Sequence, residues 1–384
     1  MNCQKHLFHL SANEHYLNCS YLSPLLKTVE EAGIKGLRGK RHPWNLKPDD
    51  FFEDANKIRQ EFAKLIHADN PQQIALIPAV SYGMSTVAKN LPVKKGGNIV
   101  VAGEQFPSNV YPWMSFCNDH NCTLKIIEAP KESAERGKIW NQRILEAISD
   151  DTILVALGSV HWADGTRFDL ENIGSIAREK NAFFVIDGTQ SIGAMPFDVN
   201  KVQPDALICA GYKWLMGPYG TSLGYFGPRL LDGKPLEEGW IVRKNSENFG
   251  GLVEYEEEYQ PGALRFDMGE RSQFINLPMI VEALKQVNAW TPEAIQSYCK
   301  KLCSGAIIEL RENGFQIEDE EWRGHHMFGI RLSKGLSIDA LKEKLSENHL
   351  HVSVRGSSVR VSPHLYNDEK DVKVLKSTFL SLRH

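Results

Sequence analysis

Short apolar runs alternate with amphipathic segments between residues 74 and 227. The runs are bounded by polar and Gly-containing turns, as buried strands are. The predicted strands are IALIPA (74–79), NIVVAGE (98–104), TLKIIEA (123–129), TILVALGSV (152–160), AFFVIDGT (182–189), ALICAGYK (206–213) and TSLGYFG (221–227). Helical spacing predicts helices over 50–67, 83–90, 109–118, 140–149 and 170–180. Strands that alternate with helices predict crossover units, and hence a largely parallel sheet covered on both faces.

The pattern changes after this region. Residues 228–275 are irregular and rich in Gly, Glu and aromatic residues, and residues 280–384 follow the order helix, strand, helix, strand, strand, helix. That order is typical of a smaller α+β unit, against which we expect the N-terminal segment to pack. The sequence therefore predicts an α/β protein with a large domain over 31–275 and a small domain formed by 1–30 and 276–384.

Composition narrows the classes of function. A chain of 384 residues is too long for one ordinary core, so two domains are expected. Its 48 acidic and 44 basic residues give a net charge of −4, which argues against nucleic acid or an acidic membrane as partner. No apolar run approaches the roughly 20 residues of a membrane helix, and the N-terminus lacks the pattern of a signal peptide, so we expect a cytoplasmic location. The seven cysteines form no CxxC pair, and no metal site is expected.

Two polar residues stand where consecutive predicted strands end. Asp187 closes AFFVID, and Lys213 closes ALICAGYK before a Gly- and Pro-containing stop. In open parallel sheets, ligands bind beyond the carboxyl ends of the strands. A pyridoxal-phosphate (PLP) enzyme needs this pair, because a lysine amine holds the cofactor aldehyde as a Schiff base and a carboxylate keeps the pyridine nitrogen protonated. Either residue alone is weak evidence, since strand ends often carry an Asp cap or a solvated Lys.

The segment from Phe184 to Gly220 resembles the signature of the class V aminotransferases, a family of PLP enzymes that includes cysteine desulfurases, selenocysteine lyases, isopenicillin N epimerases and kynureninases. The resemblance extends from YLNCSYLSPL near residue 16 to VRVSPHLYN near residue 360. It implies the PLP-dependent transferase fold of type I, with a mostly parallel seven-stranded sheet, a small C-terminal domain and a homodimer. It also implies that Lys213 forms the Schiff base, that Asp187 faces the pyridine nitrogen, and that Gln190 hydrogen-bonds the ring hydroxyl or the Schiff base.

Further cofactor contacts follow from the same resemblance. Phe106, within EQFPSNVYPW, matches the aromatic that stacks on the ring, with a core Phe as the alternative. Tyr212 matches a His or Tyr that donates to the phosphate. The strand–turn–helix stretch PAVSYGMST offers a helix N-terminus for the phosphate. Its expected donors are the backbone amides of Val80, Ser81 and Tyr82 and the Ser81 hydroxyl; Val80 departs from relatives that have two hydroxyl residues here.

Two loops match segments near the cofactor. SVHWADGTRFDL (159–170) resembles a loop that touches the ring from the side, so His161 and Trp162 are candidate contacts and His161 a candidate catalytic group, although a lone His after a strand is often structural. RFDMGERSQF (265–274) resembles a segment that reaches the phosphate of the neighbouring subunit. Many relatives have Thr where Glu270 stands, so the Gly269 amide or Arg271 is the expected donor, if any.

The C-terminal stretch SVRGSSVRVSPHLYN supplies the candidate substrate contacts. Arginine grips a carboxylate through two parallel hydrogen bonds, and Arg360 matches the family arginine that holds the α-carboxylate. Arg355 matches a second arginine at the mouth of the site, and we expect Asn18 and Ser20 to line the same opening. The aromatic cluster at 42–44 either covers the substrate side chain or packs conventionally.

The stretch between the two arginines bears on the reaction. Cysteine desulfurases carry their nucleophilic cysteine in a longer segment here, whereas this chain has only Gly356, Ser357, Ser358 and Val359. A persulfide needs a thiolate beside the substrate sulfur. The sequence thus argues against transfer of sulfur through a cysteine, with Cys19 as the one residue able to overturn this.

We expect Lys213 to remove the α-proton of a small or medium amino acid while Arg360 fixes its carboxylate. Transamination and carbon–sulfur or carbon–selenium elimination are the expected outcomes, with an epimerase or kynureninase-like hydrolase as the alternative. A binding or regulatory protein of the same fold with little catalysis, and an α/β protein that does not bind PLP, remain open from the sequence.

Overall fold

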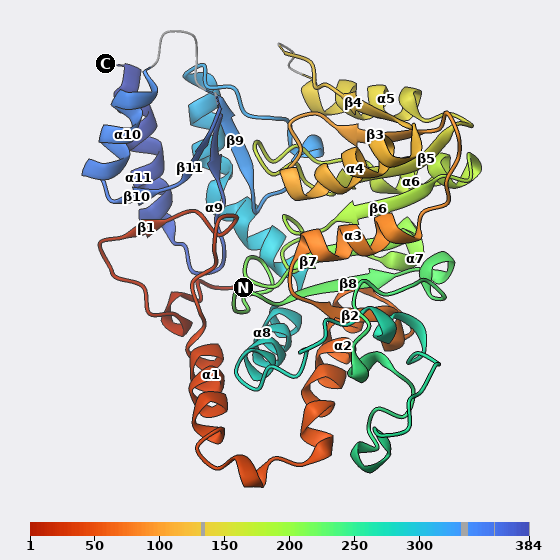
Figure 1. Ribbon diagram of the computed structural model, residues 1–384. Helices are drawn as coiled ribbons and strands as arrows, with labels where there is room; N and C mark the ends of the chain where they lie inside the picture. Colours follow the sequence, from red (N-terminus) through yellow and green to blue (C-terminus); the bar gives the residue numbers. More distant parts are fainter. Residues whose placement is uncertain (132–134, 332–336, 357, 384) are drawn as a thin grey trace.

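The computed structural model describes residues 1–131, 135–331, 337–356 and 358–383, and it is built around a seven-stranded sheet (Figure 1). The strands of this sheet are β2 (Ile74–Ile77), β3 (Asn98–Ala102), β4 (Thr123–Ile127), β5 (Thr152–Gly158), β6 (Phe183–Asp187), β7 (Ala206–Ala210) and β8 (Ser222–Phe226). Their order is β2-β8-β7-β6-β5-β3-β4. Each lies within one of the seven predicted runs, so the sheet is confirmed. Only β8 runs antiparallel to its neighbours, β2 and β7, so the other six strands end at one common edge.

Helices cover both faces of this sheet because its strands are apolar on both sides. One face packs against α2 (Glu53–Ile66), α5 (Arg136–Ala147), α6 (Leu170–Glu179) and α8 (Asn276–Trp290). The other packs against α3 (Val80–Asn90), α4 (Tyr111–His120) and the 3₁₀ turn Gly262–Phe266. The short helix α7 (Val199–Val202) precedes β7. The predicted helices are therefore present, with ends that differ by a few residues.

A smaller layer lies beside the large sheet. Its antiparallel sheet has the order β11-β12-β9, formed by β9 (Phe328–Arg331), β11 (Ser353–Arg355) and β12 (Ser358–Val361). Around it pack α9 (Pro292–Glu312), α10 (Ile338–Glu347) and α11 (Glu369–Leu380), and their apolar side chains form a separate core. The α+β character predicted for this region is confirmed.

The N-terminal segment is tied to the small layer. Strand β1 (His15–Tyr16) pairs in parallel with β10 (Leu350–His351), and Leu17 N donates to His351 O at 3.0 Å. Helix α1 (Lys27–Gly39) then turns away and packs on α8, which also contacts α2 (Figure 1). Because α8 shares its core with the large sheet, the chain crosses between the two layers more than once, and the predicted domain boundaries at 31 and 275 stay a prediction.

Candidate active site

The polar residues of the site come from the edge where the parallel strands end. Asp187 is the last residue of β6, and Lys213 lies in the turn that follows β7, its neighbour in the sheet. Phe106 follows β3, and His161 and Trp162 follow β5. Adjacent parallel strands bring their carboxyl ends together, so residues far apart in sequence converge there.

Lys213 and Asp187 are both buried and lie close enough for each to affect the other's pKa. Burial lowers the pKa of Lys213 to about 8, with the nearby charge of Arg360 as the second cause and Asp187 acting in the opposite direction. Burial likewise raises the pKa of Asp187, while hydrogen bonds from Thr189 and the charge of Lys213 partly offset the rise. The Thr189 amide donates to Asp187 Oδ1 at 3.0 Å and fixes the carboxylate. The structure thus brings together the two residues on which the sequence hypothesis depends.

Aromatic rings surround the lysine amine. Lys213 Nζ lies 5.8 Å from the ring centre of Phe106 and 5.6 Å from that of Tyr212. Phe106 is 40% exposed, so its face is available to a ligand rather than packed in the core. Its ring meets Trp162 edge-on at 5.4 Å, and Trp162 Nε1 donates to Glu104 O at 2.7 Å. The stacking role of Phe106 stays a prediction, and the ring lies within 5.8 Å of the lysine amine.

The N-terminus of α3 offers backbone donors near the site. The preceding residue, Ala79, is extended and cannot cap the helix with its side chain. The amides of Tyr82 and Gly83 bond back to Ala79 O at 3.1 and 3.3 Å. The first amides of a helix have no intrahelical acceptor, so those of Val80 and Ser81 are the better candidates for an anion. The Tyr82 amide, predicted as a third donor, is partly engaged.

Arg360 is a buried cation held without a carboxylate. Its guanidinium donates to Trp162 O and, at 3.4 Å, to Ser353 Oγ, while its Nε has no partner. Among the described residues it makes no ion pair. Burial, followed by the charge of Arg355, lowers its pKa to about 9. A buried guanidinium of this kind is costly unless an anion arrives to pair with it, which agrees with the carboxylate-binding role predicted for Arg360.

Arg355 lies near Trp162, and its predicted place at the mouth of the site stays a prediction. Its guanidinium lies 5.6 Å from the ring centre of Trp162, and its Nη1 donates to Val354 O at 2.9 Å. The segment that follows it cannot be described completely, because Ser357 lies outside the described residues. Gly356 adopts a positive φ of 56° there, which favours glycine.

Three residues predicted to contact a ligand form hydrogen bonds within the chain instead: Gln190, Asn18 and Ser20. Gln190 donates to Ser20 O at 3.1 Å and accepts from Trp214 Nε1 at 3.0 Å, which leaves one amide hydrogen for a ligand. The Ser20 hydroxyl is buried 2.7 Å from Ser362 Oγ. Asn18 accepts from Ser353 Oγ at 2.8 Å. These contacts connect the N-terminal segment to both layers, and they favour a scaffolding role over direct lining of the opening.

His161 has protein neighbours on both ring nitrogens. Its Nδ1 lies 2.9 Å from Asp164 Oδ1, its Nε2 lies 3.2 Å from Glu104 O, and its ring packs edge-on against Trp140. Only 2% of the residue is exposed. The catalytic role considered for His161 stays a prediction, and the geometry favours the structural alternative, in which it holds the loop that carries Trp162.

The predictions for the segment 265–274 and for the aromatic cluster at 42–44 concern residues outside the strand ends. The Gly269 amide, one donor expected for a neighbouring subunit's phosphate, donates to Glu237 Oε2 at 2.6 Å. Arg271, the other expected donor, forms an ion pair with Asp267, with Nε 2.9 Å from Oδ2, but its buried Nη1 has no hydrogen-bond partner among the described residues. Trp44 is 76% exposed in the turn between α1 and α2, well away from the strand ends (Figure 1). Within this chain it neither packs in the core nor covers the site.

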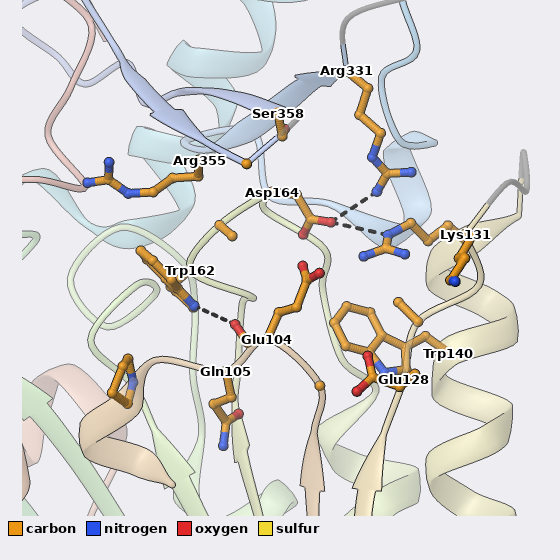
Figure 2. A pocket seen from close by; sticks show the side chains of 16 residues that line it. Glu104, Gln105, Glu128, Lys131, Trp140, Trp162, Asp164, Arg331, Arg355 and Ser358 are labelled. Carbon is orange, nitrogen blue, oxygen red and sulfur yellow. Dashed lines mark hydrogen bonds and ion pairs between the residues drawn. The ribbon is translucent and has the colours of Figure 1, made fainter. Parts of the chain in front are cut away.

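A cavity of about 810 Å³, which the sequence did not reveal, lies between the loops that follow β3, β4 and β5 and the strands of the small layer. Figure 2 shows that charged side chains of both signs line it, with Glu104 and Glu128 below, Asp164 above them, and Arg355 and Arg331 at opposite sides. Asp164 Oδ2 lies 3.2 Å from Arg136 Nε and 3.0 Å from Arg331 Nη2, which joins the two layers. Glu104, Glu128 and Asp164 all follow strands, so the signal that identified Asp187 could also have identified them.

None of the described helices is long and apolar enough to cross a membrane. Among the described residues, no three or more His, Cys, Asp or Glu side chains gather in a way that could hold a metal ion.

Comparisons with known proteins identify the family of this chain. The family model for aminotransferase class-V matches residues 49–375. The chain belongs to the class V aminotransferase family. An uncharacterized aminotransferase, YcbU, of Bacillus subtilis is 27% identical over 84% of this chain and 82% of its own length. A probable cysteine desulfurase of Methanothermobacter thermautotrophicus is 26% identical over 84% of this chain and 82% of its own.

Solved structures show the same fold. The cysteine desulfurase CsdA of Escherichia coli aligns with a TM-score of 0.79 at 17% identity, over 99% of this chain and 97% of its own. A mutant of the protein C-DES, with glycine covalently linked to its PLP cofactor, aligns with a TM-score of 0.82 at 17% identity, over 98% of each chain. This class V member is thus a PLP-dependent enzyme of the aminotransferase or lyase type, with the predicted fold of type I.

The residues at the strand ends fit PLP. A buried amine, a buried carboxylate on the adjacent strand and a half-exposed aromatic ring lie at the ends of the parallel strands, and the helix α3 begins just after β2, a strand of the same direction. Each matches one part of the cofactor: aldehyde, pyridine nitrogen, ring and phosphate. The buried Arg360, which makes no ion pair with the described residues and has an unpartnered Nε, matches the carboxylate of an amino-acid substrate.

Proposed function

We propose that this enzyme removes the α-proton of an amino acid, with Lys213 as base, and that it completes a transamination or a carbon–sulfur or carbon–selenium elimination. The observation that carries the proposal is the buried pair of Lys213 and Asp187 on neighbouring strands, each within range of the other's charge. When bound, PLP supplies an electron sink for the charge that develops at the α-carbon.

The side chains of the site bind and orient the cofactor and the substrate and move the proton. Asp187 would hold the pyridine nitrogen of PLP and supply the negative charge that favours its protonated form. Arg360 binds the α-carboxylate and so orients the α-carbon toward Lys213, while Phe106 and Trp162 exclude water from one side. A lysine whose pKa is lowered to about 8 exchanges its proton near neutral pH, which suits a group that must both accept and return one.

We further propose that no cysteine carries sulfur. The charge of Lys213 acts on the Cys19 thiol, but burial raises the pKa of that thiol to about 12. Cys299 and Cys303 are buried in α9, where burial raises the pKa of both thiols. A persulfide requires an accessible thiolate. The homodimer and the cytoplasmic location remain predictions alongside this proposal.

Reduction with borohydride tests whether PLP is attached to Lys213 as a Schiff base. The purified protein is expected to show a visible absorption band, and reduction followed by peptide mass spectrometry should place the cofactor on Lys213. The Lys213→Ala variant should lose the label, and Lys201→Ala, which alters an exposed lysine on α7, should keep it. A label on another lysine would overturn the assignment of Lys213.

The reaction type needs a second experiment. Analysis of the products formed from a panel of amino acids would separate transamination, elimination, epimerisation and hydrolysis.

A further inference from the structure

His326 is a fully buried histidine of the small layer that contacts the turns of the active site. It stands just before β9. Its ring meets the ring of Trp214 edge-on, with the two ring centres 4.6 Å apart. Trp214 follows Lys213 in the chain and is itself 1% exposed. The imidazole therefore packs against the residue next to the lysine that is proposed to bind PLP.

The two ring nitrogens of His326 have different partners. Nε2 lies 2.8 Å from Gln190 O, and Nδ1 lies 2.9 Å from Gln296 Nε2 on α9. A carbonyl oxygen can only accept a hydrogen bond. His326 Nε2 must therefore carry a hydrogen and donate it to Gln190 O.

The orientation of Gln296 decides the state of the other ring nitrogen. Its Oε1 accepts from the His325 amide at 2.9 Å, and its Nε2 donates to Ala194 O at 2.6 Å. A backbone amide only donates and a backbone carbonyl only accepts, so the side-chain amide has one orientation that satisfies both. Its second N–H then donates to His326 Nδ1, which carries no hydrogen. Burial, which lowers the pKa of His326 to about 4, favours the same neutral ring.

Gln190 is held on three sides through this contact. Its carbonyl accepts from His326, its side-chain Oε1 accepts from Trp214 Nε1 at 3.0 Å, and its Nε2 donates to a backbone carbonyl of the N-terminal segment at 3.1 Å. An indole N–H only donates, so the contact with Trp214 fixes the orientation of the Gln190 amide. Gln190 belongs to the turn that follows Asp187, and Trp214 to the turn that carries Lys213. His326 thus contacts both turns.

Two glycines make room for these contacts. A Cβ at Gly324 would come within 2.5 Å of His326 Cε1, so a side chain there would displace the imidazole. Gly193 has a positive φ of 98°, and a Cβ there would come within 2.4 Å of Trp214 O. The turn after β6 and the turn after β7 therefore touch at the backbone, and the histidine joins them from the small layer.

We propose that His326 is a positioning residue of the active site, which holds the turns of Gln190 and Lys213 in the arrangement that PLP requires. It acts through Gln190 and Trp214 and not on the substrate itself. Its role depends on the neutral ring with hydrogen on Nε2, because the opposite placement of the hydrogen would break the bonds to Gln190 O and to Gln296. This inference rests on the proposed function, since it concerns the lysine that binds PLP.

Nitrogen-15 NMR of the labelled holoenzyme tests the hydrogen-bond pattern. The imidazole signals of His326 are identified by their loss in His326→Phe or His326→Gln. They should show hydrogen on Nε2 and none on Nδ1 between about pH 6 and pH 8, the range in which an ordinary histidine changes its charge. A charged ring in that range, or hydrogen on Nδ1, would overturn the proposed arrangement.

Substitutions test whether the contact positions the lysine. His326→Phe keeps a ring against Trp214 but removes both hydrogen bonds, and Gln296→Met removes the bond that fixes the ring hydrogen. Each should weaken PLP binding by about 10-fold, as expected when a buried group loses its hydrogen-bond partner. Each should also shift the pH at which the absorption band of bound PLP changes, because the groups that contact the cofactor are held less firmly. His326→Gln, whose amide can still donate toward Gln190 O, should recover part of the affinity, and Ser297→Ala, at an exposed position beside Gln296, should change neither quantity.

The outcomes distinguish this inference from the proposed function. A merely structural role would lower the melting temperature of His326→Phe and Gln296→Met while the folded variants kept the wild-type affinity and absorption band, and that result overturns the positioning role. Gln296→Met, at a half-buried position on α9, supplies the answer if His326→Phe does not fold. Trapping of PLP on Lys213 alongside unaffected variants would leave the proposed function standing. If Lys213 does not bind PLP, the proposed function fails, and the positioning role fails with it.

Discussion

At the scale of single residues, the chemistry depends on where charges are buried. Lys213 would be an ordinary solvated amine at the surface; burial and the nearby Arg360 make its neutral form accessible near pH 8. Arg360 is itself buried with Arg355 as a second cation nearby, so the site is short of negative charge until an anionic ligand binds. The arrangement attracts a carboxylate and keeps a nucleophilic amine beside it.

The pH dependence of cofactor uptake should report this environment. Attack on the aldehyde needs the neutral amine, and the pKa of Lys213 is lowered from 10.5 to about 8. The rate at which apoprotein takes up PLP should therefore rise with pH up to about 8 and then level off. Arg360→Gln removes the second cause of the lowering, so the rise should move to higher pH.

Stopped-flow absorbance over a series of buffers measures these rates, and Arg38→Gln, on the exposed side of α1, is the matched control. If the rate of PLP uptake by the wild type continued to rise beyond pH 10, the lowered pKa of Lys213 would be contradicted. If Arg360→Gln did not move the rise to higher pH, the contribution of Arg360 to that lowering would be contradicted.

At the scale of elements, the strands could be predicted and their directions only in part. Seven apolar runs located the large sheet, yet nothing in TSLGYFG distinguishes the antiparallel β8 from its parallel neighbours. Strands β1 and β10 have two residues each, too few for a periodic pattern. Asp187 and Lys213 could be located because they end strands and match a signature. The cavity could not, because Arg331 and Glu104 meet only through tertiary packing.

Asp371, in the first turn of α11, binds residues of the N-terminal segment, and the contribution of this contact to stability can be tested. Asp371 is 1% exposed and accepts from His15 Nδ1 at 2.7 Å and Asn367 Nδ2 at 3.1 Å, with Lys5 Nζ at 3.4 Å. Removal of one partner from a buried ionic cluster is strongly destabilising, so Asp371→Ala should lower the free energy of unfolding by about 3 kcal/mol.

Denaturant titration measures the loss. The neighbouring Glu369→Ala, an exposed acid in the same helical turn, should change the free energy of unfolding by less than about 0.5 kcal/mol. Comparable losses in the two variants would show that helix capping, and not the contact between the segments, accounts for the effect.

At the scale of the whole molecule, one group of exposed apolar side chains lies on the hairpin formed by α1 and α2. The hairpin of α1 and α2 presents Ile34, Leu37 and Trp44, which are 41%, 59% and 76% exposed. Apolar side chains exposed together mark surfaces that contact another protein. This agrees with the homodimer that the resemblance implied.

Light scattering should give a mass of twice 43.3 kDa for the purified chain. The double variant Leu37→Glu with Trp44→Glu should shift the mass toward the monomer, because the two side chains would then introduce charge into an apolar contact. A wild-type monomer at micromolar concentration would contradict the dimer, and an unchanged mass in the double variant would place the contact elsewhere on the surface.

The strap formed by residues 17–20 has a consequence for how this architecture can be altered. Leu17 and Cys19 bond to His351 and Ser362 on one side, while Ser20 bonds to Gln190 beside the cofactor strand on the other. The beginning of the polypeptide is thus a component of both halves. A chimaera that borrowed its carboxyl-terminal third from a relative would have to inherit that relative's first twenty residues as well, and grafting either piece alone would disturb the catalytic lysine's surroundings.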